Sequence, residues 1–177
     1  MADWIVAIDP GNEESAYVLL DPDLKPVRFA KCSNELMWCH MIDSLHEALD
    51  VIGSEQNIHI AIEMIASYGM PVGKEVFDTC VWIGRLMERF KRYKVTLIYR
   101  KQEKLAICQS PRANDATIRQ ALVDRFAYNV PNKGKGSKKE PGWFYGFHAD
   151  IWQAYAVGIT YHDIYIAPEV KNGRTEW

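Results

Sequence analysis

The stretch Ile5-Val6-Ala7-Ile8-Asp9-Pro10-Gly11-Asn12, close to the N-terminus, decides the fold. Its four apolar residues predict a short buried strand, and Asp9-Pro10-Gly11 follows where a strand stops and turns. A carboxylate therefore ends a strand beside a tight turn, which suits a catalytic or metal-binding group. The alternative is an Asx-type turn, in which Asp9 only bonds the backbone of Gly11.

Length and composition are typical of one globular domain. The chain has 177 residues, of which 48% are hydrophobic and 25% charged, so we expect a single domain over residues 1–177. The four cysteines form no Cys-x-x-Cys pair, and they are expected to be reduced thiols without a zinc site. No stretch approaches the roughly 18 apolar residues of a membrane span, and we expect a cytoplasmic protein with no membrane partner.

Charge is distributed unevenly along the chain, although the formal net charge is only -2. Residues 1–63 hold 3 basic against 12 acidic residues, whereas residues 85–139 hold 15 basic against 4 acidic residues. Clustered Lys and Arg favour a polyanion partner on one face of the molecule. The alternative is a pair of solvated helices with basic outer faces.

Strand patterns follow the first strand. Residues 15–20 and 26–30 predict two further strands joined by a tight turn, which gives an antiparallel meander. A helical pattern over residues 34–52 comes next, and then residues 57–63 alternate as a half-buried strand that ends in Glu63. If this strand lies beside the first, the carboxylates of Asp9 and Glu63 converge.

The second half of the chain alternates between helices and one more strand. Residues 76–90 predict a helix so apolar that it is either central or buries a face against another subunit, and residues 95–99 predict a fifth strand. The next helix runs to residue 126, with Asn114 or Asp115 as its N-cap. The final helix is expected over about 148–164, with Asp150 in its first turn, where the helix dipole favours negative charge.

A loop over about 128–146, rich in Gly and Lys, separates these two helices. The spacing of its Gly, Lys and Ser residues does not match a Walker-type phosphate loop, so no nucleotide cofactor is expected. We expect a mobile basic loop that lies over a nucleic-acid backbone, with a plain linker as the alternative.

Three acids from separate elements, Asp9, Glu63 and Asp150, are the candidate catalytic centre. Such carboxylates share a small volume only when cations neutralise them, because like charges raise each other's pKa. Two Mg²⁺ ions about 4 Å apart would do so and would activate a water for phosphodiester hydrolysis.

The order of these elements resembles the RNase H-like superfamily, in particular the RuvC-like Holliday-junction resolvases. The likeness covers most of residues 4–163, and it rests on Ile8-Asp9-Pro10-Gly11, Ala61-Ile62-Glu63, Tyr99-Arg100 and the helix from Ala149-Asp150 to Gly158. Residues 118–126, Gly136-Ser137-Lys138-Lys139 with Pro141-Gly142, and Tyr145-Gly146 resemble the bacteriophage branch.

The resemblance implies an α/β, RNase H-like fold whose five-stranded mixed sheet has its first three strands antiparallel and is flanked by helices. It implies a homodimeric endonuclease that uses Mg²⁺, or Mn²⁺ as a substitute, to nick opposed strands of branched DNA, with Asp9, Glu63 and Asp150 as metal ligands. The DNA-binding candidates are Tyr68 or Met70 at the junction centre, and Arg100, Lys101, Lys138 and Lys139 at phosphates near the site. Further DNA-binding candidates are Lys74, Arg112, Lys133 and Lys135.

One position departs from the cellular members of the family, which carry two acids three residues apart on the last helix. Here Asp150 is followed by Gln153, whose amide oxygen can ligate a metal without supplying charge. His148, as a base for the attacking water, or Asp115, as an additional acid, could supply what Gln153 lacks. A site with one fewer carboxylate is expected to bind metal more weakly or to tolerate Mn²⁺ better.

Two other functions remain open at this point. The same fold could grip branched DNA without cutting it if Gln153 has impaired the metal site. An actin-like phosphotransferase could use Asp9-Pro10-Gly11 as a phosphate turn, but such kinases need two lobes and this chain has room for one.

Overall fold

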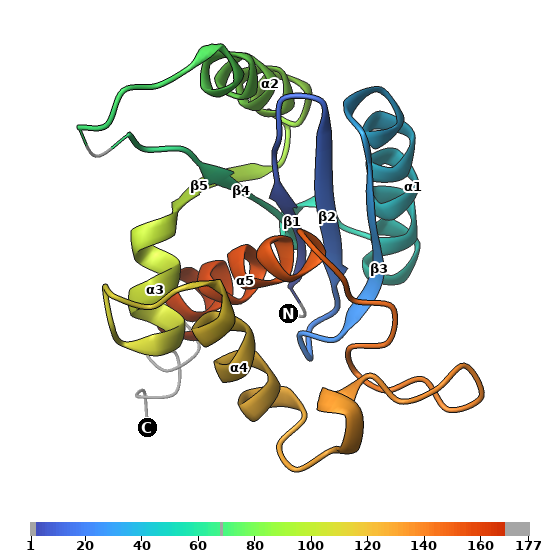
Figure 1. The fold of residues 1–177 in the computed structure, drawn as a ribbon. Coiled ribbons are helices and arrows are strands. Elements are labelled where there is room, and N and C mark those ends of the chain that lie inside the picture. Colours follow the sequence, from blue (N-terminus) through green and yellow to red (C-terminus); the bar gives the residue numbers. More distant parts are fainter. Residues whose placement is uncertain (1–2, 68, 169–177) are drawn as a thin grey trace, which may run out of the picture.

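A five-stranded sheet forms the middle layer of the molecule (Figure 1). The computed structural model describes residues 3–67 and 69–168. Its strands are β1 (Trp4–Asp9), β2 (Glu14–Leu20), β3 (Pro26–Ser33), β4 (Ile58–Met64) and β5 (Lys94–Tyr99), in the order β3-β2-β1-β4-β5. The first three strands pair antiparallel, and β4 and β5 continue the sheet in parallel with β1. The expected mixed sheet is confirmed.

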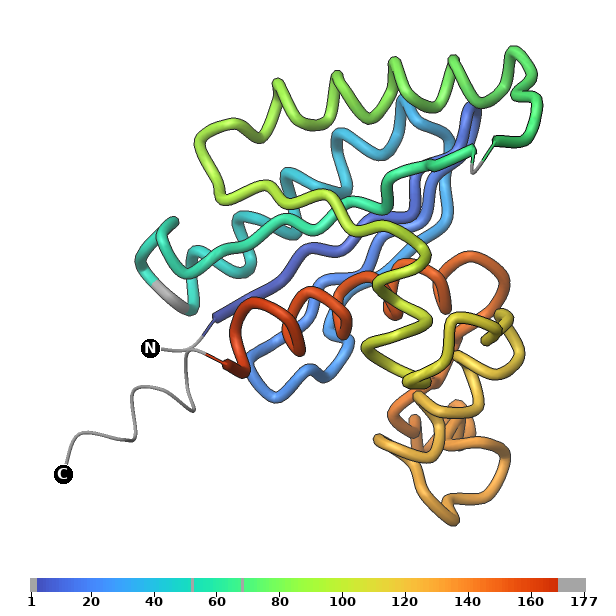
Figure 2. The backbone as a smooth tube through the Cα atoms, turned by 90° about the vertical axis from the view of Figure 1, so that its left-hand side faces the viewer, coloured from blue at the N-terminus to red at the C-terminus, as the bar shows by residue number. Residues whose placement is uncertain are grey.

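Helices cover both faces of this sheet (Figure 2). One face carries α1 (Asn34–Ile52) and α2 (Lys74–Arg89), and the other carries α3 (Arg100–Cys108), α4 (Asp115–Phe126) and α5 (Ile151–Tyr161). Short 3₁₀ turns occur at Glu55–Asn57 and Pro131–Gly134, and a π-helical turn at His162–Ile166 extends α5. None of the described helices is long and apolar enough to cross a bilayer.

The alternation of side chains along β1 and β4 sets the direction of the acids that end them. Val6, Ile8 and Ile62 pack into the core under α1 and α2, whereas Ala7 and Ala61 pack into the core under α5. Because successive side chains of a strand point to opposite faces, Asp9 and Glu63 belong to the α5 face.

Helix α5 lies almost fully buried against the centre of the sheet. All of its residues except Gln153 are buried, and its strongest contacts are with β1 and β2. A Cβ atom on Gly158 would come within 2.6 Å of Leu20 Cδ1 and 3.0 Å of Ala7 Cβ, so only glycine permits this close approach.

One expectation about the helices needs revision. The last helix begins at Ile151 rather than near residue 148, because Ala149 has a φ of 39°, which is incompatible with a right-handed helix.

Of the two alternatives for α2, a central helix is excluded. Phe77 is 60% exposed and Val81 58% exposed, while Trp82 and Ile83 face the core. The other alternative, a helix that buries a face against another subunit, stays a prediction.

Candidate active site

Asp9 and Glu63 meet at the carboxyl ends of β1 and β4. Ile8 pairs with Ile62 in the parallel ladder, so the next residue of each strand is an acid. The two carboxyl groups are within hydrogen-bonding distance of each other. Burial raises the pKa of Asp9 from 3.8 to about 9, and the neighbouring Glu63 and Asp150 add to this increase. Burial also raises the pKa of Glu63.

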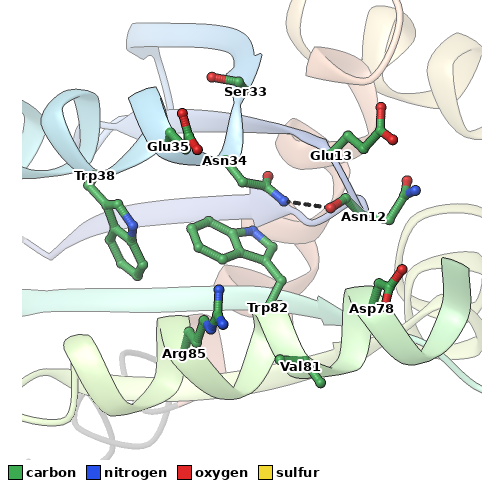
Figure 3. A pocket seen from close by; sticks show the side chains of 10 residues that line it. All are labelled: Asn12, Glu13, Ser33, Asn34, Glu35, Trp38, Asp78, Val81, Trp82 and Arg85. Carbon is green, nitrogen blue, oxygen red and sulfur yellow. Dashed lines mark hydrogen bonds between the residues drawn. The ribbon is translucent and has the colours of Figure 1, made fainter.

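The turn after β1 is held by other groups than the Asp9 carboxylate. The amide of Gly11 donates to Ser15 Oγ at 3.2 Å, and Trp82 Nε1 donates to the same oxygen at 2.9 Å. The side chain of Asn34 donates to the backbone carbonyls of Gly11 and Asn12. Figure 3 shows the hydrogen bond to Asn12, in a pocket that Trp38 and Trp82 also line. The Asx-turn alternative is therefore wrong for the Gly11 amide, and Asp9 is not needed to close this turn.

Glu103 is a further buried acid that the sequence analysis missed. It lies in α3, its side chain is 0% exposed, and it interacts electrostatically with both Glu63 and Asp9. Burial raises the pKa of Glu103 to about 8, Glu63 adds to the increase, and Arg100 opposes it. The sheet register explains its position: α3 begins directly after β5, whose last residue, Tyr99, pairs with Met64. The first turn of α3 must therefore lie at the sheet edge where Glu63 lies.

The guanidinium group of Arg100 connects three elements of this site. It bonds Glu103 in its own helix and Asp115 in α4, and it donates to Gln153 Oε1 in α5 at 2.9 Å. Asn114, not Asp115, caps α4, because its side chain accepts from the amide of Thr117. Asp115 is 66% exposed, so it lies at the rim of the site.

Asp150 lies at the N-terminal end of α5, where it precedes the first helical residue. Its carboxylate pairs with Lys31 Nζ of β3 at 2.9 Å, and the same ammonium group lies 3.3 Å from Glu14. The Asp150 side chain is half-exposed, and its charge contributes to the raised pKa of Asp9. His148 is exposed just before this helix.

Several segments that carry DNA-binding candidates lie toward the end of the sheet that carries the acids. Figure 2 shows that the β4–α2 loop, α3 and the segment 131–147 all extend toward the side of the molecule where β1 and β4 end. Tyr68 lies outside the described residues. Arg100 and Lys135 are partly buried. The other candidates are exposed, namely Met70, Lys74, Lys101, Arg112, Lys133, Lys138 and Lys139.

The basic segment contains a hydrogen-bonded hairpin. The amide of Ser137 donates to the carbonyl of Glu140 at 2.9 Å, and the amide of Gly142 donates to that of Lys135 at 3.0 Å, which closes a tight hairpin. Phe144, directly after the hairpin, is fully buried in the core beneath α5. This anchor fixes the position of Lys138 and Lys139 at the tip.

The chemistry of the donor atoms suits a hard divalent cation. Carboxylate oxygens of Asp9, Glu63, Glu103 and Asp150 and the amide oxygen of Gln153 are the ligands that Mg²⁺ and Mn²⁺ prefer. Within residues 3–67 and 69–168, no three His, Cys, Asp or Glu side chains are arranged so that they could hold a metal ion without moving. Lys31, Arg100 and retained protons neutralise the acids instead.

Comparison with solved structures identifies the fold. RuvC from Thermus thermophilus superimposes with a TM-score of 0.60 at 13% sequence identity, covering 96% of this chain and 96% of that chain. The T. thermophilus RuvC complex with a Holliday-junction substrate gives a TM-score of 0.57 at 13% identity, covering 91% and 93%. Neither a family model nor a curated protein sequence matches the chain. The sheet order, the helical layers and this near-complete superposition establish that the chain has the RuvC-like, RNase H-like fold.

Proposed function

We propose that this protein is a metal-dependent endonuclease that resolves four-way and related branched DNA by hydrolytic nicking of opposed strands. The observation that carries the proposal is the convergence of Asp9 and Glu63 at the ends of two parallel strands, beside Asp150 of α5. The likeness to a RuvC that was solved with a Holliday-junction substrate supports the choice of DNA.

The residues of this chain would divide the work as follows. Asp9, Glu63 and Asp150 would hold Mg²⁺ or Mn²⁺, and two such ions would activate a water and stabilise the leaving oxygen of the phosphodiester. Gln153 would add a neutral oxygen ligand, and His148, exposed at the start of α5, would accept a proton from the attacking water. Lys101, Lys138 and Lys139 would hold phosphates of the bound strand.

A homodimer would place two such sites on opposed strands. The exposed residues Phe77, Val81, Gly84 and Glu88 lie four, three and four positions apart on α2, which is the spacing of one helical stripe. An apolar pocket of about 670 Å³ lies along this stripe, between Val81 and Trp38 of α1. Exposed apolar surface of this kind, rimmed by Arg85 and Arg89, favours association with a second copy.

A second candidate function is a binding module that grips branched DNA without cutting it. The observation that favours it is the contact between Arg100 and Gln153, because a cation of the protein lies where the last helix offers an amide instead of an acid. Tight junction binding with no product in Mg²⁺ or Mn²⁺ would select this function.

The experiment is strand-labelled cleavage of a four-way junction, with a linear duplex of matched sequence as control, in Mg²⁺, Mn²⁺ or EDTA. The proposal expects cleavage of the junction only, and only with metal. Equal cleavage of the duplex would contradict the substrate class. Hydrolysis of ATP without any DNA cleavage would support the phosphotransferase alternative instead.

A further inference from the structure

Glu103 is an unusual residue to find inside a packed helix layer. Its side chain is fully buried, and its Oε2 atom pairs with Arg100. Its Oε1 atom is also buried, and within the described part of the chain no N–H or hydroxyl group donates to it. A buried carboxylate oxygen without a donor is destabilising, because it has lost water and gained nothing in return. The carboxyl group of Glu103 interacts with Glu63, so it belongs to the acid cluster.

The position of Glu103 relative to Gln153 is equally informative. One nitrogen of Arg100, Nη1, bonds Glu103 and also donates to Gln153 Oε1 at 2.9 Å. Glu103 Oε2 of α3 and Gln153 Oε1 of α5 therefore both bind the same positively charged nitrogen, Arg100 Nη1. The side chain of Gln153 is neutral, whereas Glu103 can carry a negative charge.

We propose that Glu103 is a metal-binding carboxylate of the acidic site, and that Arg100 is its counterion when no cation is bound. This inference rests on the proposed function, and it names the acid that the last helix lacks at Gln153. Asp115 is the competing candidate, because it lines a pocket with Asp150 and Gln153. Its side chain is 66% exposed and paired with Arg100, however, whereas Glu103 is fully buried beside Glu63. Metal binding would release Glu103 from Arg100, which would remain paired with Asp115.

The competing explanation is structural. Arg100 connects α3 to α4 and α5 through Asp115 and Gln153, and Glu103 pairs with Arg100 within α3, so Glu103 could serve only to position Arg100 for packing. The two explanations differ in a property of the DNA-free protein: only the first makes metal affinity depend on Glu103.

The test is Mn²⁺ binding by isothermal titration calorimetry without DNA, on the wild type, Glu103→Gln and Arg100→Gln. Glu103→Gln keeps an oxygen but loses the negative charge, so it should bind Mn²⁺ about 10-fold more weakly or worse, as expected for a change in the ligand environment of a metal site. Arg100→Gln frees Glu103 from its competitor and should bind Mn²⁺ at least as tightly as the wild type. Asp163→Asn is the matched control, because it breaks the partly buried ion pair with Arg125 at the other end of α5. It should stay within about twofold of the wild type.

Several outcomes would overturn the inference: no Mn²⁺ binding by the wild type, Glu103→Gln within twofold of the wild type, or weaker binding by folded Arg100→Gln. If Glu103→Gln does not fold, as judged by circular dichroism, Arg100→Gln decides, because Glu103 is intact in it. Junction binding in Ca²⁺ and junction cleavage in Mn²⁺, both by the wild type, test the proposed function separately. A wild type that binds Mn²⁺ through Glu103 but neither binds nor cuts junctions would retain the metal site and refute the nuclease.

Discussion

Asp9 and Glu63 follow directly on the paired residues Ile8 and Ile62 of two parallel strands, and their carboxyl groups lie within hydrogen-bonding distance. Burial and the neighbouring acid raise the pKa of Asp9 to about 9 in the folded protein, against 3.8 as its ordinary value. At neutral pH the metal-free folded protein therefore retains a proton on Asp9, whereas the unfolded chain has released it.

This proton predicts an inverted pH dependence of stability. Between about pH 4 and pH 9 the folded state binds more protons than the unfolded state, so the free energy of unfolding falls as pH rises, by up to about 1.4 kcal/mol per unit per proton. Thermal unfolding in EDTA should therefore show a lower melting temperature at pH 8.5 than at pH 6. A melting temperature that rises over this range would contradict the retention of a proton on Asp9.

Replacing Asp9 should separate stability from activity. Asp9→Asn is uncharged without taking up a proton on folding, so at pH 8.5 in EDTA its melting temperature should exceed that of the wild type by about 2–4 °C for each kcal/mol gained. The same variant should lose DNA cleavage by about 100-fold or more, because the charged metal ligand becomes a neutral amide. Asp23→Asn, an exposed acid in the β2–β3 turn, is the control and should change neither property.

The affinity for metal should increase with pH, whereas the stability of the metal-free protein should decrease. Metal binding must displace protons from Asp9 and from Glu103, whose pKa burial raises to about 8. Mn²⁺ affinity should therefore increase from pH 6.5 to pH 8.5, and calorimetry in buffers of different ionisation enthalpy should detect proton release. Affinity that does not change with pH would argue against metal binding at these acids.

The basic hairpin should contribute to DNA affinity without reading sequence. Lys138→Glu combined with Lys139→Glu should weaken junction binding at every sequence, and the salt dependence of log K should become shallower by about 0.9 per lost phosphate contact. Fluorescence anisotropy at several salt concentrations measures this slope. Lys25→Glu, exposed in the β2–β3 turn, serves as the control. An unchanged slope would remove the hairpin from the DNA surface.

The exposed stripe on α2 should hold the dimer together. Phe77→Glu places a charge on this apolar surface and should convert the protein to a monomer that still folds, since Phe77 is 60% exposed. Val51→Glu, on an α1 side chain that is 69% exposed, is the matched control. Analytical ultracentrifugation should give a monomer for the first variant and a dimer for the second. A dimeric Phe77→Glu would locate the interface elsewhere.

Local patterns in the sequence were sufficient for the sheet and for the acids that end its strands. The apolar run before Asp9 and the alternation before Glu63 predict both strands and both carboxylates, because each signal lies within a few residues. The start of α5 was misplaced because the conformation of Ala149, with its φ of 39°, leaves no trace in its residue type.

The partners of the acids could not be predicted from sequence. Lys31 and Asp150 are 119 positions apart, and Arg100 and Gln153 are 53 positions apart, so only tertiary structure brings them together. Glu103 stands in the run Arg100-Lys101-Gln102-Glu103-Lys104, which has the composition of a solvated helix. Its burial depends on how α3 packs against α4 and α5, a long-range effect that outweighs local polarity.

Cleavage of a supercoiled plasmid that extrudes a cruciform tests the central claim most directly, with wild type and Asp9→Asn compared in Mn²⁺ and in EDTA. Paired nicks within the lifetime of one complex give linear DNA, whereas a single nick relaxes the plasmid and gives an open circle. The account predicts linear product from the wild type in Mn²⁺, and no product from Asp9→Asn or in EDTA. Linear product that persists in Asp9→Asn or in EDTA, or no product from a wild type that binds Mn²⁺, would contradict it.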